Sequence, residues 1–330
     1  MGCRQFGKAQ ATSASRLTED LRMETRRLEY FLKIIEFGSI SRAAAHFKLA
    51  QPALSQQLAV LETEMHAQLA TRSVRGVSPT QAGLALYRHA QVLVRHLEQA
   101  QAEVSELAGA SSTPVSIGLP LSTACMMSMP LLEEVRRRHT NIRLQLLEDL
   151  SGSLADMMLS NRLDLAVLFE NAQTDGFKMD PLWIEELFLV VPAQARLADP
   201  TPIRDLARMD LVLPSGKNGS RLVLEAALAR VNIEPRIVAE LDSIPTLKSA
   251  VAQGIGFTVL PWSAIHADVS SRKLKAVRIT GKGFVRTVSL CASRTLAPTP
   301  AVECVARILR ELATANAASG KSRGMSLPNL

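Results

Sequence analysis

The apolar residues of the N-terminal third recur every three or four positions, which is the spacing of an amphipathic helix. The stretch RRLEYFLKIIEF over residues 26–37 predicts a helix that ends at Gly38. Ser39 or Ser41 can cap a second helix, which reaches about Phe47. Two short helices in close succession are therefore predicted, and a third follows at once.

The third predicted helix carries polar residues on its first turns. It begins near Pro52, a residue suited to a first helical turn, and reaches about His66. Gln51, Ser55 and Gln56 point outward from its leading half, where amides and hydroxyls can bond base edges or phosphate oxygens. Two helices joined by a tight turn predict a helix-turn-helix that binds double-stranded DNA. An ordinary helical hairpin with a solvated face is the alternative, because this pattern is loose.

The next elements favour the DNA-binding interpretation. Val74 and Val77 flank Arg75-Gly76, which predicts a β-hairpin placed like a wing. From about Gln81 to Leu107 the pattern predicts a long amphipathic helix. A small domain cannot cover its apolar seam, so we expect it to pair with a second copy. The residues assigned to DNA contact are Ser41, Arg42, Lys48, Gln51, Pro52, Ser55, Gln56, Arg72 and Arg75.

Beyond a short linker, GASSTP, short apolar runs alternate with helical stretches. A strand at residues 115–119 followed by a helix at 125–138 is typical, and a helix over 299–313 closes the series. This alternation predicts an α/β fold with mainly parallel sheets. The polar residues 1–22, which contain no secretory signal, and residues 319–330 are predicted to be disordered. No run approaches the ~18 apolar residues of a membrane span, so a cytoplasmic protein without a membrane partner is predicted.

Composition narrows the classes of function. The net charge of +7 suits a polyanion, but residues 1–110 hold 13 Lys and Arg against 10 Asp and Glu, so charge locates no site. Four scattered cysteines and six unclustered histidines predict a reducing compartment, with no metal and no cofactor. An enzyme is disfavoured because no P-loop, G-x-G-x-x-G, G-x-S-x-G or H-E-x-x-H motif occurs. A solute-binding protein is the other alternative, against which the N-terminal module counts.

Taken in order, these motifs resemble the LysR-type transcriptional regulators from about Arg27 to Leu312. The likeness is carried by RRLEYFLKIIEFGSISRAAAHFKLAQPALSQQLAVLE, RGVSPTQAG, LDLAVL and AVAQGIGFTVLP. The segments AQPALSQQ and QVLVRHLEQAQ are similar to the nitrogen assimilation control type. The resemblance implies an N-terminal winged helix-turn-helix over residues 23–82 and a linker helix for dimerisation over 83–108. It also implies a two-subdomain α/β effector-binding domain over 114–318, similar to the type 2 periplasmic binding proteins.

The resemblance further implies a cleft between the two subdomains that holds a small polar, anionic metabolite. Subdomain I would comprise about 114–191 and 287–315, and subdomain II about 192–286. Ligands bind at the carboxyl ends of strands and at exposed helix N-termini, and each small hydroxyl there is alternatively a helix cap. The effector-binding residues implied are Ser122, Thr123, Ser151, Ser215, Ser243 and Thr246.

Promoter DNA, RNA polymerase and further copies of the chain are the implied partners. The linker helix would form a homodimer, and dimers would join into a homotetramer that controls nitrogen-assimilation or related metabolic genes. Two residues depart from the family pattern. Ala50 replaces a common Ser or Thr, which removes a side-chain cap before the third helix, and Ala70 replaces a Phe before the wing.

Overall fold

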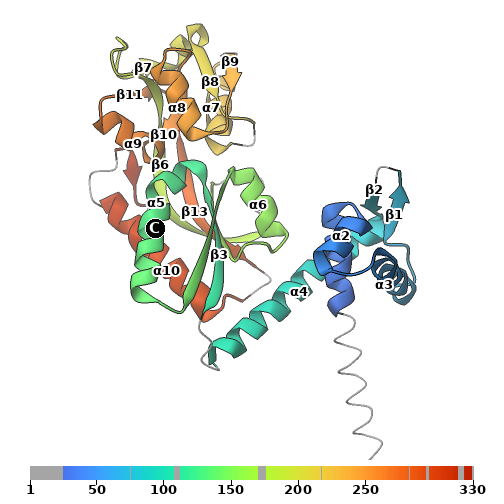
Figure 1. Cartoon of the computed structure of the whole chain (residues 1–330). Helices are drawn as coiled ribbons and strands as arrows, with labels where there is room; N and C mark the ends of the chain where they lie inside the picture. Colours follow the sequence, from blue (N-terminus) through green and yellow to red (C-terminus); the bar gives the residue numbers. More distant parts are fainter. Residues whose placement is uncertain are drawn as a thin grey trace, which may run out of the picture. The chain divides into compact units, whose positions relative to one another are not determined.

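The computed structural model divides the chain into two compact units, Met1–Gln101 and Ala102–Leu330, and each is described by itself (Figure 1). The predicted extension over residues 1–22 and the wing residue Arg75 lie outside the described residues. None of the described helices combines the length and the apolar character that a membrane crossing requires. The structure describes residues 25–74, 76–107, 112–169, 176–216, 218–281, 283–294, 297–318 and 323–328.

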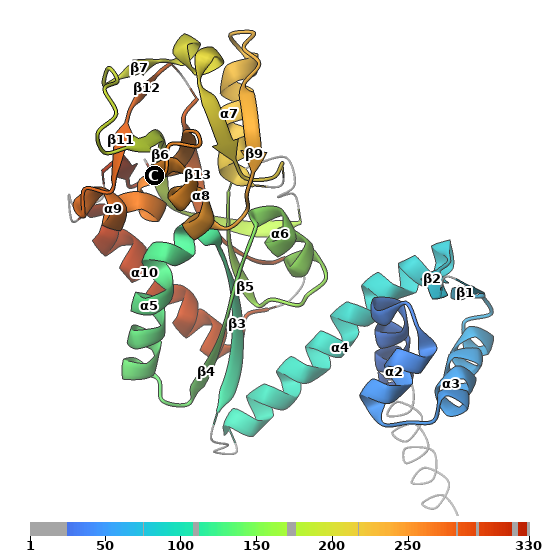
Figure 2. The same cartoon turned by 45° about the horizontal axis from the view of Figure 1, so that its top comes forward.

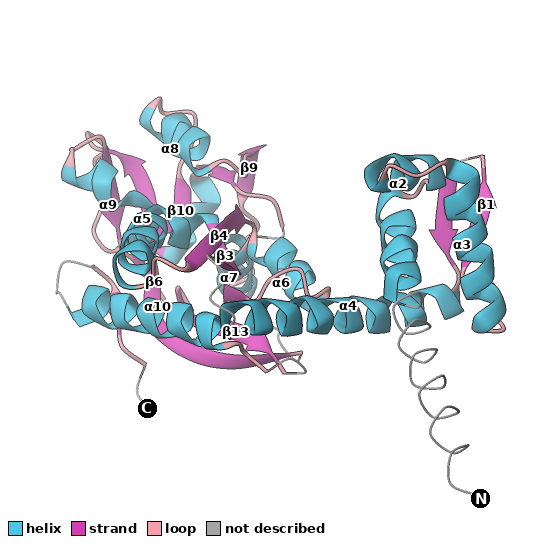
Figure 3. Ribbon diagram, turned by 60° about the horizontal axis from the view of Figure 1, so that its bottom comes forward, coloured by secondary structure: helices cyan, strands magenta, loops and turns pink. Residues whose placement is uncertain are grey.

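The N-terminal unit consists of helices and one β-hairpin, in the order that the sequence predicts. A helix over residues 25–37 is followed by α2, α3, an antiparallel pair of strands β1 and β2, and α4. Figure 3 shows α4 as one continuous helix. The bounds are α2 Ile40–Phe47, α3 Gln51–Glu64, β1 Ala70–Ser73, β2 Gly76–Pro79 and α4 Gln81–Leu107.

Local chemistry explains where these helices begin and end. The Ser39 hydroxyl caps α2 by accepting a hydrogen bond from the Arg42 amide, which decides between the two predicted caps. Lys48 ends α2 in the left-handed conformation. Ala50 offers α3 no side-chain cap, as predicted, and Pro52 lies in its first turn. Small residues of α2 pack against α3 in a core that includes Phe31, Ile34, Ala43, Ala44, Leu54, Leu58 and Leu61.

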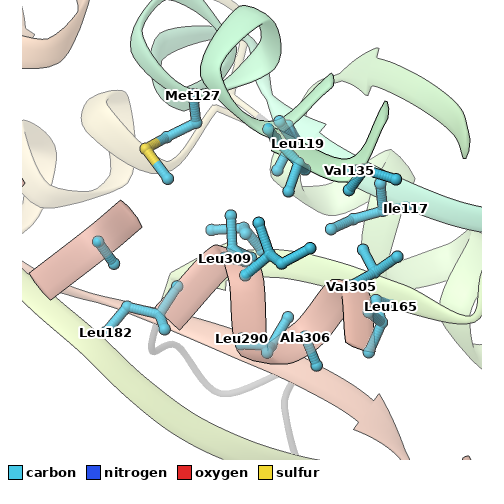
Figure 4. Packing of buried hydrophobic residues seen from close by; sticks show 14 of the residues in the cluster. Ile117, Leu119, Met127, Val135, Leu165, Leu182, Leu290, Val305, Ala306 and Leu309 are labelled. Carbon is cyan, nitrogen blue, oxygen red and sulfur yellow. The ribbon is translucent and has the colours of Figure 1, made fainter. Parts of the chain in front are cut away.

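Two halves make up the C-terminal unit (Figures 1 and 2). In the first half, the parallel strands β3, β4 and β5 are covered by three helices. Its apolar core lies between the sheet, α5 and α10 (Figure 4). The helix α5 begins earlier than predicted, so Ser122 and Thr123 lie in its first turn. The elements are β3 Thr113–Pro120, α5 Leu121–Arg138, β4 Ile142–Asp149, α6 Ser151–Leu159, β5 Leu165–Phe169 and α10 Pro300–Ala318.

The second half is formed by the residues between two long strands. The strand pairs β8–β9 and β7–β12 are parallel there, and α9 is a helix that the sequence pattern did not predict. Its elements are β7 Thr201–Pro202, η1 Ile203–Arg208, β8 Asp210–Leu213, α7 Gly219–Ala229, β9 Arg236–Glu240, α8 Ile244–Ala252, β10 Thr258–Pro261, α9 Trp262–Ser270, β11 Leu274–Val277 and β12 Ile279–Thr280.

Two antiparallel strands cross between the halves, β6 Phe177–Pro192 and β13 Val285–Ser293. The first part of β6 pairs with β13, which pairs with β5, and its last part pairs with β10 and β11. All of these pairings are antiparallel, so the prediction of mainly parallel sheets was wrong for this region. The chain enters the second half on one strand and returns on its neighbour, which requires opposite directions. The sequence pattern located only the end of β6, from Leu187.

The C-terminal residues correct a second prediction. Residues 319–330 were expected to be disordered, but residues 323–328 are described, and Met325–Ser326 forms the strand β14. β14 pairs with β6 in the antiparallel direction. The strand is only two residues long, so the sequence pattern gave no sign of it. Backbone pairing with β6 holds it, and this pairing does not depend on an apolar pattern.

Candidate DNA-binding and effector-binding sites

The helix α3 separates its apolar and polar residues as a DNA-reading helix requires. Leu54, Leu58 and Leu61 are buried in the core of the N-terminal unit. Gln51, Pro52 and Gln56 are exposed, and Ser55 is half-buried. The leading turns of α3 therefore offer amides and a hydroxyl to solvent while its apolar side holds the unit together.

Among the described residues, the basic ones predicted to contact phosphates are all exposed, but one of them already bonds another part of the protein. Lys48 in the turn and Arg72 on β1 are exposed, as is Ser41 on α2. The Arg42 guanidinium donates to the Phe37 carbonyl oxygen, so part of it is already used to close the end of the preceding helix.

Two residues hold the wing in place: Glu62, which the sequence reading missed, and Gly76, which it placed in the predicted hairpin. Glu62 on α3 accepts hydrogen bonds at Oε1 from the Leu69 and Ala70 amides, at 2.8 Å and 3.1 Å, and so ties β1 to α3. Gly76 closely approaches the turn after the first helix, where an added Cβ would lie 2.5 Å from the Gly38 carbonyl oxygen. The hairpin is thereby held although Ala70 is small.

The helix α4 exposes apolar side chains over much of its length. Ala90 is fully buried, whereas Leu93 is 54% exposed, Leu97 40% and Val104 66%. These residues belong to the seam that the sequence pattern predicted. An exposed apolar row on one long helix is the surface that a second copy would cover.

In the C-terminal unit, α5 and α6 begin beside each other at the carboxyl edge of the sheet, since β3 and β4 pair in parallel up to Pro120 and Asp149. Neither helix receives a side-chain cap. The Oγ1 of Thr123 and the Oγ of Ser151 are buried and have no hydrogen-bond partner among the described residues. Two helix N-termini with two unsatisfied hydroxyls favour an anionic or polar ligand.

A buried arginine joins the two halves at this edge. Arg286 on β13 donates from Nη2 to the Ser122 Oγ on α5 at 3.0 Å, and from Nη1 to the Ser220 Oγ on α7 at 3.1 Å. Its guanidinium also lies 3.4 Å from the centroid of the Phe169 ring. Gly219 makes room chiefly for the Phe169 ring, because a Cβ there would lie 2.3 Å from the ring and 3.2 Å from the Arg286 Nη1. Ser122 is therefore committed to a protein partner rather than left open.

Glu185 neutralises this arginine. It lies directly opposite Arg286 on β6, and its Oε1 accepts from the Arg286 Nε at 2.7 Å. Its Oε2 accepts from the Ser263 hydroxyl on α9 at 3.2 Å and from the Trp183 indole at 3.4 Å. Burial lowers the pKa of the Arg286 guanidinium, and the Glu185 carboxylate opposes that shift. We call Ser122, Glu185, Ser220, Ser263 and Arg286 the Arg286 network.

The remaining predicted effector residues are in part helix caps. Ser243 caps α8, and the Thr246 hydroxyl donates to the Ser243 oxygen at 3.0 Å. The Ser215 amide donates to Asp242 at 2.8 Å. Ser243 and Thr246 are exposed, so the structure gives them the alternative role of capping. The signal that could have revealed the Arg286 network is the presence of charged residues in two strand sequences, Glu185 and Glu186 in WIEELFLVVP and Arg286 in VRTVSLCAS.

Metal binding finds no support in the part of the chain that the structure describes, where no group of three or more His, Cys, Asp or Glu residues is placed to hold an ion.

The chain combines a winged helix-turn-helix, a long helix with an exposed apolar row, and an α/β unit of two halves. This combination is that of a DNA-binding transcriptional regulator with an effector-binding domain. The profile of bacterial regulatory helix-turn-helix proteins of the lysR family matches residues 25–84. That of the LysR substrate binding domain matches residues 108–314. The chain belongs to the LysR family of transcriptional regulators.

Several relatives are similar over most of the chain. The nitrogen assimilation regulatory protein nac of Klebsiella aerogenes is 38% identical over 295 residues, which cover 88% of this chain and 95% of the relative. The protein of the same name from Escherichia coli is 38% identical over 273 residues, covering 81% and 88%. The transcriptional regulator BbuR of Bordetella bronchiseptica is 35% identical over 274 residues, covering 82% and 84%. All three are regulators rather than enzymes.

Solved structures confirm the fold. A full-length OxyR from Pseudomonas aeruginosa matches with a TM-score of 0.66 and 22% identity, covering 93% of this chain and 98% of that one. Full-length CbnR in complex with its target DNA matches with a TM-score of 0.59 and 19% identity, covering 87% and 99%. Both have the same two-unit architecture.

Proposed function

We propose that this protein acts in the cytoplasm on promoters of nitrogen-assimilation or related metabolic genes, in response to a small metabolite. The pathway is supported by the names of two relatives that are 38% identical over most of their length. The division into residues 23–82, 83–108 and 114–318 belongs to the same proposal, and so does contact with RNA polymerase at the promoter.

One observation supports the proposed DNA contacts: the first turns of α3 expose polar side chains, while the apolar face of the same helix is buried. In this proposal Gln51 and Ser55 contact base edges, with Pro52 and Gln56 beside them. Ser41, Arg42, Lys48, Arg72 and Arg75 contact the backbone.

Selection of binding sites from random DNA tests these contacts. The full-length protein should enrich one motif, and Gln51→Ala should lose about 1–3 kcal/mol of discrimination at one base position. Gln101→Ala removes an exposed amide from α4 and serves as the control, with no change in motif. If Gln51→Ala enriches the same motif to the same degree, Gln51 does not read sequence.

The assembly is proposed to be a homodimer through α4 and a tetramer of two such dimers. The exposed row of Leu93, Leu97 and Val104 supports the pairing, because apolar side chains on one face of a helix gain free energy when a second copy covers them.

The effector is proposed to be a small anionic metabolite held at the N-termini of α5 and α6. The unsatisfied hydroxyls of Thr123 and Ser151 support this position, and each would gain a partner from a carboxylate or amide. Ser215, Ser243 and Thr246 would line the opposite wall. Binding regulates only if the two DNA-binding states differ in their affinity for the metabolite.

A thermal-shift screen with metabolites tests the cleft. Thr123→Val removes the buried hydroxyl and keeps its shape, so it should abolish a shift that the unaltered protein gives. Ser271→Ala, which removes an exposed hydroxyl at the end of α9, should keep that shift. A shift that survives Thr123→Val would place the ligand elsewhere.

A further inference from the structure

The last described residues of the chain lie against β6 at the point where it leaves the first half. Met325 pairs with Glu185 and Ser326 with Ile184, and the Glu186 amide donates to the Gly324 carbonyl oxygen at 2.7 Å. On β13, Arg286 pairs with the same Glu185. The C-terminal strand β14 therefore reinforces the backbone of the residue that anchors the Arg286 network. The LysR substrate-binding profile ends at residue 314, before this strand.

One end of this segment contacts the second half. The Arg323 guanidinium lies 5.0 Å from the centroid of the Phe188 ring. Its Nη1 donates to the Ala276 carbonyl oxygen of β11 at 3.3 Å. Its Nη2 forms an ion pair with the Asp199 carboxylate at 3.6 Å. Ala276 and Asp199 belong to the second half, and Phe188 on the crossing strand β6 packs in the apolar core of that half.

The other end contacts the first half. Met325 packs against the apolar core that lies between the sheet, α5 and α10. Between the two ends, Gly324 adopts a φ of +71°, which favours glycine. A Cβ at this position would lie 2.8 Å from the Phe188 ring and 2.9 Å from the Glu186 Cβ, so the segment fits closely against β6.

We infer that residues 323–328 form a strap that fixes the angle between the two halves of the C-terminal unit. Arg323 contacts the second half and Met325 contacts the first. Because the segment between them is short, both sets of contacts can form in only one relative orientation of the two halves. A change in that angle must break one set. The strap thus adds a free-energy difference between orientations of the halves, and this holds whether or not a metabolite occupies the cleft.

Hydrogen–deuterium exchange on the full-length protein tests the strap. Two variants are compared with the unaltered protein: a truncated chain that ends at Ala318, and Arg323→Ala. Arg204→Ala is the control, because Arg204 is an exposed arginine of the second half that lies outside the strap. The readout is exchange at residues 125–128 and 222–225, whose amides donate to the carbonyl oxygens at the first turns of α5 and α7. These turns meet at Arg286 and lie in the two separate halves.

Without the strap, both helix starts should exchange on the order of tenfold faster, because loosened halves open the Arg286 network locally. Arg323→Ala should give a smaller increase at the same residues, the control none, and β3 in the core should stay protected. Faster exchange confined to residues 184–186 and 274–277 would overturn the inference, since the tail would then cover only its own neighbours. A uniform increase through the whole unit would overturn it as well, because the tail would then be a general stabiliser.

Discussion

The two candidate sites of this protein are built in opposite ways. In the N-terminal unit, exposed polar side chains stand on a core made by residues close together in the chain. In the C-terminal unit, the side chains of the Arg286 network are buried and bond one another, and Ser122 and Arg286 meet across 164 positions. The leading turns of α3 thus present their polar side chains to solvent, whereas the residues of the Arg286 network already bond one another. Substitutions at the exposed residues of α3 should therefore act on binding, and substitutions in the Arg286 network on folding.

The largest effect is expected at the buried ion pair. Arg286→Ala leaves the Glu185 carboxylate buried without its charge partner, which should cost about 3–5 kcal/mol of the free energy of unfolding of the C-terminal unit. Urea denaturation followed by tryptophan fluorescence measures this, since Trp183 belongs to the unit.

A double variant separates pairing from packing. Glu185→Gln together with Arg286→Met removes both charges and should recover part of the lost stability. If Arg286→Ala alone unfolds no earlier than the unaltered protein, the network contributes nothing and the contrast between the units fails.

Charge on the exposed row of α4 should have the next largest effect. Leu97→Asp would bury an unpaired carboxylate in the proposed dimer, weakening it by about 3 kcal/mol, or roughly a hundredfold in dissociation constant. Multi-angle light scattering at micromolar concentration measures the mass. His96→Asp introduces the same charge at the neighbouring exposed position outside the predicted seam and is the matched control. A Leu97→Asp protein that keeps its mass would exclude this face as the interface.

A smaller effect is expected from the wing. Arg72→Ala should weaken binding to every DNA sequence and lower the slope of log affinity against log salt by about 1, because one phosphate contact is lost. Fluorescence anisotropy titrations at several salt concentrations give this slope. A loss restricted to one sequence would instead mean that Arg72 reads bases.

The smallest expected effect concerns a helix cap. Ala50→Ser would give α3 the side-chain cap that it lacks and should stabilise the N-terminal unit by about 1 kcal/mol. Ser39→Ala removes the existing cap of α2 and should have the opposite sign. Thermal unfolding measured by circular dichroism compares them. Equal melting temperatures for the two variants would show that capping does not limit this unit.

The sequence predicted the elements of the N-terminal unit because their signals are local. Helical spacing, Gly38, Ser39 and Pro52 define the helices within a few residues. In the C-terminal unit the same rules found most of the longer strands and helices but missed β7, η1, α9, β11, β12, β14 and the start of β6. Tertiary pairing rather than local pattern decides those segments, as the β14–β6 ladder shows.

The candidate sites divide in the same manner. The exposure of Gln51 and Gln56 could be predicted because a polar turn on an apolar helix is visible in one short window. Ser122 was assigned to effector binding, and its contact with Arg286 was missed, since no spacing rule connects residues 164 positions apart. Ser243 and Thr246 were assigned to ligand binding by position alone, and their mutual hydrogen bond gives them a capping role.

The route of β6 and β13 has a consequence for synthesis of the protein. β13 lies between β5 and β6 in the sheet, and α10 supplies Val305 and Leu309 to the first half's core, yet both elements are translated after the whole second half. The core of the N-terminal unit is built from residues 28–87, which leave the ribosome first. Domains generally fold as units, the N-terminal ones first during synthesis. A nascent chain should thus carry a folded DNA-binding unit while the edge of β5 is still unpaired, because β13 has not yet been made. Chaperone binding should matter most during this interval, since an unpaired strand edge promotes aggregation.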